Sequence, residues 1–310
     1  MKDKTMPLEI GKASTGASPQ AEKTDPAYLK IRDLIYGISG IYYSEEKLYL
    51  LSSRCSRRMA ALKVATAPEY LEHLTTRGNR DAELRLLLNE ITIGETYMFR
   101  HPAQLDALRN VILPQILQIK SLISLKRLRF WCAGCSTGEE PYTLAMFLLE
   151  EKDKMLAGWT WDILATDLND NSLETARAGI YGEYALRNSS DLLRRKYFKD
   201  LGDKRLQTND LLKSQLRFDR INLSDDSKMI FQKGMDIIFC CNVLIYFDLT
   251  SKRRVVQHFY SNLMPGGYLF LGHAESLFQV DDSFRLMHFP GTTGYWKPTS
   301  MQMAAAGNKK

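Results

Sequence analysis

The segment 128–145 (LRFWCAGCSTGEEPYTLA) joins an apolar run, a turn of small residues and an acidic helix start. Its apolar residues 128–132 predict a buried strand. The small residues 133–138 predict a tight turn, in which Gly134 and Gly138 let a ligand approach the main chain closely. In a doubly wound fold such a turn lies at the carboxyl end of the sheet, where nucleotide-like ligands bind. An ordinary glycine turn is the alternative, because the segment matches neither GxGxxG nor a Walker loop.

The helix after this turn carries its own start signals. Ser136 and Thr137 each precede a glutamate by three residues, the spacing at which a hydroxyl and a carboxylate cap each other's backbone amides. Pro141 suits the first helical turn, where its missing N–H costs nothing. We therefore expect side-chain capping at this helix start.

Composition limits the class of protein. A chain of 310 residues suggests about two domains, and 45% hydrophobic with 25% charged residues is typical of soluble proteins. No apolar run approaches the roughly 20 residues of a membrane span, and the N-terminus has no signal-peptide core. We therefore expect a cytoplasmic protein without direct membrane insertion. The mild net charge of +6 favours a local acidic partner surface over nucleic acid.

The five cysteines are an odd number, which argues against a full set of disulfides. Cys132 and Cys135 form a CxxC motif, which can bind zinc or carry out redox chemistry; two buried, unreacted thiols are the other explanation. No second ligand pair stands at zinc-finger spacing. We expect free, buried thiols and no metal site.

Periodicity divides the chain into two folded parts between polar ends. Residues 1–24 and 298–310 lack apolar periodicity and are predicted to be disordered. Residues 25–100 show helical spacing of apolar residues, which predicts a small all-helical N-terminal domain. Residues 101–297 alternate apolar strands with helices, which predicts an α/β domain with a mainly parallel sheet. The expected elements are strands at 161–167, 216–223, 235–243 and 268–276 and helices at 169–181 and 251–264, with an inserted subdomain at about 183–219.

Polar residues follow the predicted strands. Asp167 ends the second strand, where it can accept hydrogen bonds from ribose hydroxyls or cap the next helix. Asn242 follows another strand, and burying its amide requires partners in the backbone or a ligand. His273 and Glu275 favour a structural or pocket-edge role, since nothing supplies the third member of a catalytic triad.

Six strings in this sequence resemble the CheR family of chemotaxis receptor glutamate methyltransferases. They are ETYMFR (95–100), STGEEPY (136–142), ATDLN (165–169), ARAGIY (176–181), FCCNVLIYF (239–247) and GHAES (272–276). The resemblance extends from about Asp25 to Trp296. It implies an all-helical receptor-recognition domain and a Rossmann-like class I methyltransferase domain dependent on S-adenosylmethionine, with an inserted small β-subdomain. It also implies methylation of glutamate γ-carboxylates on receptors.

The resemblance implies roles for individual residues. S-adenosylmethionine, and its product S-adenosylhomocysteine, would meet Gly94, Thr96, Arg100, Ala133, Gly134, Glu140, Asp167, Asn222, Leu223, Cys241 and Asn242. Arg100 and Tyr246 would stand beside the methyl group as catalytic residues. A glutamate acceptor is already ionised at neutral pH, so no general base is required. Arg100 can grip its carboxylate bidentately, and Tyr246 can donate a hydrogen bond to it.

Two positions depart from the family pattern. The family usually has arginine at Cys241 and commonly has asparagine at Gly94, so both departures remove polar contacts. A catalytically weak binding module is therefore one alternative, and a methyltransferase acting on a small molecule or RNA is another. The other matching residues favour an active enzyme.

Three arginines suggest how a receptor is held. Arg54, Arg57 and Arg58 share one side of a predicted helix by their three- and four-residue spacing. In the family the matching helix meets the acidic cytoplasmic methylation helices of membrane chemoreceptors; a solvated helix face is the alternative. The insert is short beside relatives that bind a receptor tail, which predicts recognition independent of that tail. We expect a monomer.

Overall fold

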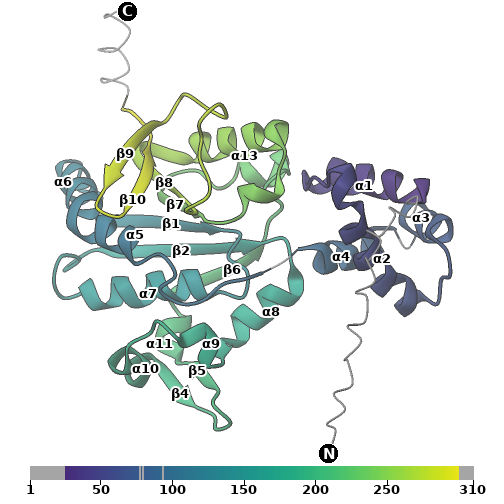
Figure 1. Cartoon of the computed structure of the whole chain (residues 1–310). Coiled ribbons are helices and arrows are strands. Elements are labelled where there is room, and N and C mark those ends of the chain that lie inside the picture. The colour runs from purple at the N-terminus through teal and green to yellow at the C-terminus, as the bar shows by residue number, and fades with distance from the viewer. Residues whose placement is uncertain (1–24, 77, 79, 93, 300–310) are drawn as a thin grey trace, which may run out of the picture.

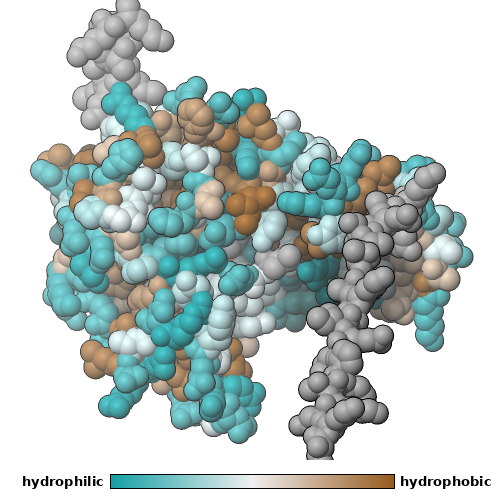
Figure 2. Space-filling view, in the orientation of Figure 1, coloured by the Kyte–Doolittle hydropathy of each residue, from teal (hydrophilic) through white to brown (hydrophobic). Residues whose placement is uncertain are grey.

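The structure is a computed structural model that describes residues 25–76, 78, 80–92 and 94–299. The two predicted disordered ends, 1–24 and nearly all of 298–310, lie outside the described residues. Among the described helices, none is long and apolar enough to cross a membrane. The face shown in Figure 2 is largely hydrophilic, with its apolar residues in separate patches.

Four helices form the N-terminal part and lie to one side of the sheet (Figure 1). They are α1 (Pro26–Ser39), α2 (Leu48–Leu62), α3 (Ala67–Thr75) and α4 (Arg80–Ile91), with the short 3-10 helix η1 (Glu45–Lys47) before α2. Helix α1 begins where the carboxylate of Asp25 accepts a hydrogen bond from the Ala27 amide, and it ends at Gly40 in the left-handed conformation. The apolar stripes predicted from the sequence are the buried faces of these helices.

The C-terminal part is built on a seven-stranded sheet with the order β6-β2-β1-β7-β8-β10-β9. Its strands are β1 (Arg127–Ala133), β2 (Thr160–Asp167), β6 (Leu216–Arg220), β7 (Met235–Cys240), β8 (Leu263–Leu271), β9 (Arg285–Phe289) and β10 (Thr292–Trp296). The pairs β1–β2, β2–β6, β1–β7 and β7–β8 are parallel, as predicted. The antiparallel hairpin β9–β10 was not predicted, because its strands are short and half-exposed.

Helices cover both faces of the sheet. They are α5 (Pro102–Ala107), the π-helical turn η2 (Leu108–Ile112), α6 (Leu113–Leu122), α7 (Glu139–Glu151), α8 (Asp170–Ala178), α12 (Asp226–Met229) and α13 (Leu249–Asn262). Helices α5, η2 and α6 follow one another without a break. Strand β1 sends Trp131 into the core cluster that contains α13, and Phe130 into the cluster that contains α7. Successive side chains of a strand point to opposite faces, so two cores enclose the sheet.

The inserted subdomain is built around a small antiparallel sheet, as the family resemblance implied. It contains a three-stranded antiparallel sheet, with β3 (Ile180–Tyr181), β4 (Phe198–Asp200) and β5 (Leu206–Thr208) in the order β3-β5-β4. The short helices α9 (Glu183–Leu186), α10 (Asp191–Tyr197) and α11 (Asp210–Lys213) surround it (Figure 1). The helix predicted over 169–181 ends at Ala178, because Gly179 takes the left-handed conformation and the chain turns into β3.

The helical part is hydrogen-bonded directly to the loop after β7. Ile41 and Phe247 form an isolated antiparallel bridge, and the amide of Tyr42 donates to the carbonyl of Tyr246 at 3.0 Å. This loop contains the 3-10 helix η3 (Leu244–Tyr246). The position of Tyr246 therefore depends on both parts of the chain.

Candidate functional site

A cavity of about 270 Å³ opens at the carboxyl ends of β1 and β7. The chain leaves β1 for β2 and β6 on one side and returns to β7 on the other, so these two ends form the topological switch point of the sheet. Ligands of doubly wound sheets bind at this point. Residues from the turn after β1, from the loop after β7 and from the segment 94–101, here called the strap, line the cavity.

The turn after β1 is as tight as predicted, but the helix start differs from the prediction. Gly138, with φ of 96°, is the N-cap of α7, and no side chain caps the helix. The Thr137 hydroxyl instead donates to the Glu139 carboxylate at 2.7 Å. The predicted side-chain cap is wrong because the left-handed glycine turns the two hydroxyls away from the helix amides. The Ser136 hydroxyl is consequently buried without a hydrogen-bond partner among the described residues.

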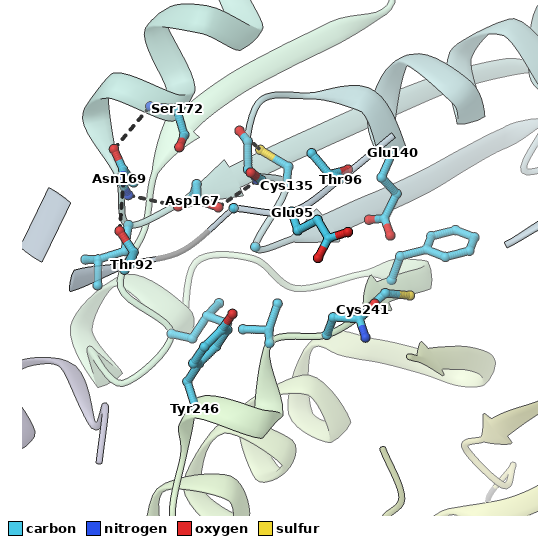
Figure 3. Close-up of a pocket in the computed structure, with 18 of the residues that line it drawn as sticks. Thr92, Glu95, Thr96, Cys135, Glu140, Asp167, Asn169, Ser172, Cys241 and Tyr246 are labelled. Carbon is cyan, nitrogen blue, oxygen red and sulfur yellow. Dashed lines mark hydrogen bonds between the residues drawn. The ribbon is translucent and has the colours of Figure 1, made fainter. Parts of the chain in front are cut away.

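Asp167 stands at the end of β2, facing the turn. Its two oxygens accept hydrogen bonds from the amides of Ser136 at 2.7 Å and Asn169 at 2.8 Å. Asn169 itself caps α8 through the Ser172 amide, so Asp167 is not the cap of that helix (Figure 3). Burial raises the pKa of Asp167, and the backbone hydrogen bonds offset part of that rise. Each oxygen retains a free lone pair for a ligand hydroxyl.

Glu140 lies at the opposite side of the cavity from Asp167, close to Cys241 (Figure 3). Burial raises the pKa of Glu140 to about 7. Hydrogen bonds from the thiols of Cys241 and Cys132 and the charge of Arg100 lower it only in part. The pocket therefore holds a buried carboxyl group that gains a favourable partner when a cationic ligand arrives.

The cysteines are all free among the described residues, and Cys132 and Cys135 are buried, as predicted. The thiol of Cys241 also approaches the Gln104 side-chain oxygen at 3.6 Å. Burial raises the pKa of Cys132, Cys135 and Cys241 well above the ordinary thiol value. These sulfurs are therefore neutral thiols at physiological pH and poor nucleophiles.

The loop after β7 is fixed by Glu275. Asn242 takes the left-handed conformation with φ of 62°, which is uncommon for a residue with a side chain. The Glu275 carboxylate accepts hydrogen bonds from the amides of Asn242 at 2.6 Å, Gly272 at 2.7 Å and Ile245 at 3.2 Å. Its predicted structural role is confirmed. The Asn242 side-chain oxygen lines the cavity, buried and unpaired within the described part of the chain.

The strap brings Thr96 and Arg100 to the cavity. The guanidinium of Arg100 donates to the carbonyl of Glu95 at 2.5 Å, within the strap. Its charge lowers the pKa of Tyr246 and of Glu140 against the larger effect of burial. At Gly94 a Cβ atom would lie 2.2 Å from the Ser136 hydroxyl oxygen. The Ser136 hydroxyl thus occupies the space into which a side chain at position 94 would extend.

Asn222, Leu223 and Gly134 also line the cavity, whereas Ala133, predicted beside them, is buried at the end of β1 and does not line it. The Asn222 side-chain amide donates to the carbonyl of Ile38 at 2.6 Å, and its oxygen accepts from the Ser224 amide at 3.0 Å. Its side chain therefore joins the two parts of the chain, and any ligand contact falls to its backbone.

The three arginines predicted to hold a substrate are not equivalent. Arg58 forms a bidentate ion pair with Glu83 at 3.0 and 2.9 Å, and its side chain is only 16% exposed. Arg57 pairs loosely with Glu90 at 3.4 Å and is 60% exposed. Arg58 is thus committed to packing α2 against α4, whereas Arg57 and the half-exposed Arg54 remain accessible from solvent.

The cavity suits S-adenosylmethionine by its chemistry. The buried carboxyl group of Glu140 can bind the cofactor's ammonium group, and the carboxylate of Asp167 can accept hydrogen bonds from its ribose. The buried side-chain oxygens of Ser136 and Asn242 lack hydrogen-bond partners within the described residues and can bind polar atoms of a ligand. Ser136, Gln104 and Glu95 also line this cavity, and the sequence did not identify them as site residues. A single serine in a glycine turn carries no signal of an unpaired hydroxyl, and Gln104 lies in an ordinary helix.

Comparison with known proteins identifies the family to which the two parts of the chain are similar. The model of the CheR methyltransferase SAM-binding domain matches residues 94–292, and that of the CheR all-alpha domain matches residues 26–92. Chemotaxis protein methyltransferase 2 of Vibrio cholerae is 34% identical over 275 residues, which cover 89% of this chain and 94% of the relative. The chemotaxis protein methyltransferase of Borreliella burgdorferi is 36% identical over 244 residues, which cover 79% of this chain and 86% of the relative.

Proposed function

The chain belongs to the CheR methyltransferase family and uses S-adenosylmethionine, and we propose that it methylates glutamate γ-carboxylates on the cytoplasmic methylation helices of chemotaxis receptors. The names of its relatives support a role in chemotaxis. The observation that carries the proposal is that Arg100, Tyr246 and Glu140 line the same cavity at the carboxyl ends of β1 and β7.

The bound cofactor supplies an electrophilic methyl group, and the protein has to present a carboxylate to it. We assign Glu140 to the cofactor's ammonium group and Asp167 to its ribose hydroxyls, because each presents oxygen acceptors at opposite sides of the cavity. The proposed contacts are completed by seven residues that line the cavity, Gly94, Thr96, Gly134, Asn222, Leu223, Cys241 and Asn242, and by Ala133, which precedes Gly134 at the end of β1.

Arg100 and Tyr246 act on the acceptor. The guanidinium of Arg100 orients the glutamate carboxylate by charge-assisted hydrogen bonds, and the Tyr246 hydroxyl donates to one of its oxygens. Burial raises the pKa of Tyr246, so the phenol keeps its proton and remains a donor. No base is needed for an acceptor that is already ionised, and catalysis rests on orientation and exclusion of water.

Receptor recognition is proposed to use the exposed cations of α2. Arg54 and Arg57 can meet acidic residues of a methylation helix, whereas Arg58 supports them by holding α2 to Glu83. We further propose that recognition does not require a receptor C-terminal tail, since the inserted subdomain is short. Equal methylation of receptors with and without their tails supports this; strong tail dependence contradicts it.

The direct test is transfer of labelled methyl from S-adenosylmethionine to receptor-containing membranes. The product is expected to be alkali-labile, as a glutamate methyl ester is. Receptors whose methylation glutamates are replaced by alanine serve as the substrate control, and Tyr246→Phe as the enzyme control. Cofactor binding without any transfer to receptors contradicts the proposed substrate.

A further inference from the structure

A stack of side chains at the protein surface joins the strap to the inserted subdomain. The guanidinium carbon of Arg187 lies 3.3 Å from the ring centroid of Tyr97 and 3.8 Å from that of Tyr184. The two rings meet edge to face, with centroids 6.5 Å apart. Tyr97 belongs to the strap, whereas Tyr184 and Arg187 belong to α9 and its end. Arginine between two aromatic rings is a favourable cation–π arrangement.

The stack is accompanied by hydrogen bonds that run between the same two segments. The amide of Met98 donates to the carbonyl of Ala185 at 2.9 Å. The Tyr184 hydroxyl donates to the Glu95 carboxylate at 3.2 Å, and the Asn188 amide donates to the Phe99 carbonyl at 3.4 Å. Both the beginning and the end of the strap are thus attached to α9.

The strap needs this support, because it has no regular secondary structure and contains a strained residue. Phe99 takes the left-handed conformation with φ of 56°. Such a conformation persists only when the surroundings fix it. On one side the Phe99 amide donates to the Thr143 hydroxyl of α7 at 3.0 Å, and on the other side α9 holds Met98 and the Phe99 carbonyl.

Arg187 has no other evident task. No carboxylate among the described residues lies within ion-pair distance of it, and its remaining hydrogen bond goes to the carbonyl of Tyr184 at 2.6 Å. Its guanidinium is exposed to solvent, yet it is held against the strap. Arg100 approaches the same Tyr97 ring, with its guanidinium carbon 5.7 Å from the centroid. Figure 3 shows Glu95 and Thr96 of this strap between Asp167 and Glu140.

We infer that Arg187 is a positioning residue, which holds the Tyr97 ring and thereby sets the place of Arg100 over the reacting carboxylate. The inserted subdomain then has a function of its own in this chain: it fixes the strap that completes the active site. The kinetic test of this inference rests on the proposed methyl transfer to receptors. Its structural test depends only on the stack of Arg187 with Tyr97 and Tyr184.

The variants are Arg187→Ala, which removes the stack, and Arg187→Lys, which keeps the charge but not the planar contact. Arg195→Ala is the matched control, since Arg195 is an exposed arginine of α10 in the same subdomain. Loss of the two ring contacts is expected to lower kcat about three- to tenfold, with a smaller loss for lysine. The melting temperature and the Kd for S-adenosylhomocysteine should stay close to those of the unchanged protein.

The decisive measurement is Arg187→Ala combined with Arg100→Ala. If Arg187 acts through Arg100, removing it from the Arg100→Ala protein has no further effect on kcat. Additive losses overturn the inference.

Hydrogen exchange of a peptide spanning the strap gives a readout independent of activity. The Met98 and Phe99 amides are expected to exchange faster in Arg187→Ala than in the Arg195→Ala control. Unchanged exchange overturns the inference even if the enzyme proves inactive on receptors. Faster exchange in an enzyme that lacks receptor methylation leaves the stack supported and contradicts only the proposed substrate.

Discussion

Cofactor affinity is expected to depend on pH through Glu140. Its carboxyl group has a pKa of about 7, because burial in the cavity disfavours the charged form. The cofactor's ammonium group binds the ionised carboxylate. At pH 7 about half of the protein is therefore competent, and at pH 6 about one tenth is. Affinity should rise about fivefold between pH 6 and pH 7, which corresponds to about 1 kcal/mol.

The sign of the effect follows from the direction of the shift. A raised pKa means that the ligand-free protein holds a proton on Glu140 below pH 7, and cation binding expels that proton. His101 also lines this cavity, and burial and the charge of Arg100 lower its pKa. A Glu140→Gln variant separates any contribution of His101 from that of Glu140.

The assay is isothermal titration calorimetry with S-adenosylhomocysteine at pH 6 and pH 7, in two buffers of different ionisation enthalpy. Binding at pH 6 should release close to one proton per site. Glu140→Gln is the control: it should bind more weakly and show no dependence on pH in this range. Equal affinities at both pH values, with no proton release, refute a raised pKa at Glu140. A pH dependence that survives in Glu140→Gln assigns the effect to another group.

Three further predictions follow from the same geometry. Cys241→Arg places a cation beside Glu140, so calorimetry at pH 6 should give nearly the affinity measured at pH 7; an unchanged pH midpoint argues against this electrostatic coupling. Glu275→Gln weakens three backbone contacts, so urea denaturation should show a loss of about 2–4 kcal/mol, and wild-type stability contradicts its structural role. Arg58→Ala should cost about 3 kcal/mol in the same assay because it leaves the buried Glu83 without its cation, with the Tyr70 hydroxyl still donating to it, whereas Arg57→Ala should keep stability and reduce receptor methylation.

The sequence predicted those features that depend on neighbouring residues. The strand, the glycine turn and α7 are encoded within 128–151, and the parallel sheet follows from the alternation of apolar strands with helices. Asp167 and Asn242 were predicted at the cavity because the carboxyl ends of parallel strands meet at one edge. The family resemblance added Arg100, which no periodicity would place near β7.

The features that were missed or mistaken depend on distant partners. Arg58 looked like a free cation on its helix face, and its partner Glu83 stands 25 residues away on another helix. The structural role of Glu275 was predicted, but not its partner, the amide of Asn242, which lies 33 residues away. The spacing of Ser136 and Glu139 suits a capping box, but the left-handed Gly138 took the cap position. Local patterns state which groups are available, and only the folded chain decides which partner each group takes.

A cysteine at position 241, where the family resemblance predicts arginine, leaves a neutral thiol beside Glu140. An arginine at this position would share with Arg100 the task of compensating the buried Glu140. The thiol only donates a weak hydrogen bond, and its own ionisation is suppressed by burial. Arg100 is therefore the cation that lowers the pKa of Glu140, and we propose that it also binds the acceptor carboxylate. In this proposal the Arg100 guanidinium interacts with both the Glu140 carboxylate and the acceptor carboxylate, so its position matters more than it would if a second arginine stood at position 241. The strap that carries Arg100 therefore has to be held in place.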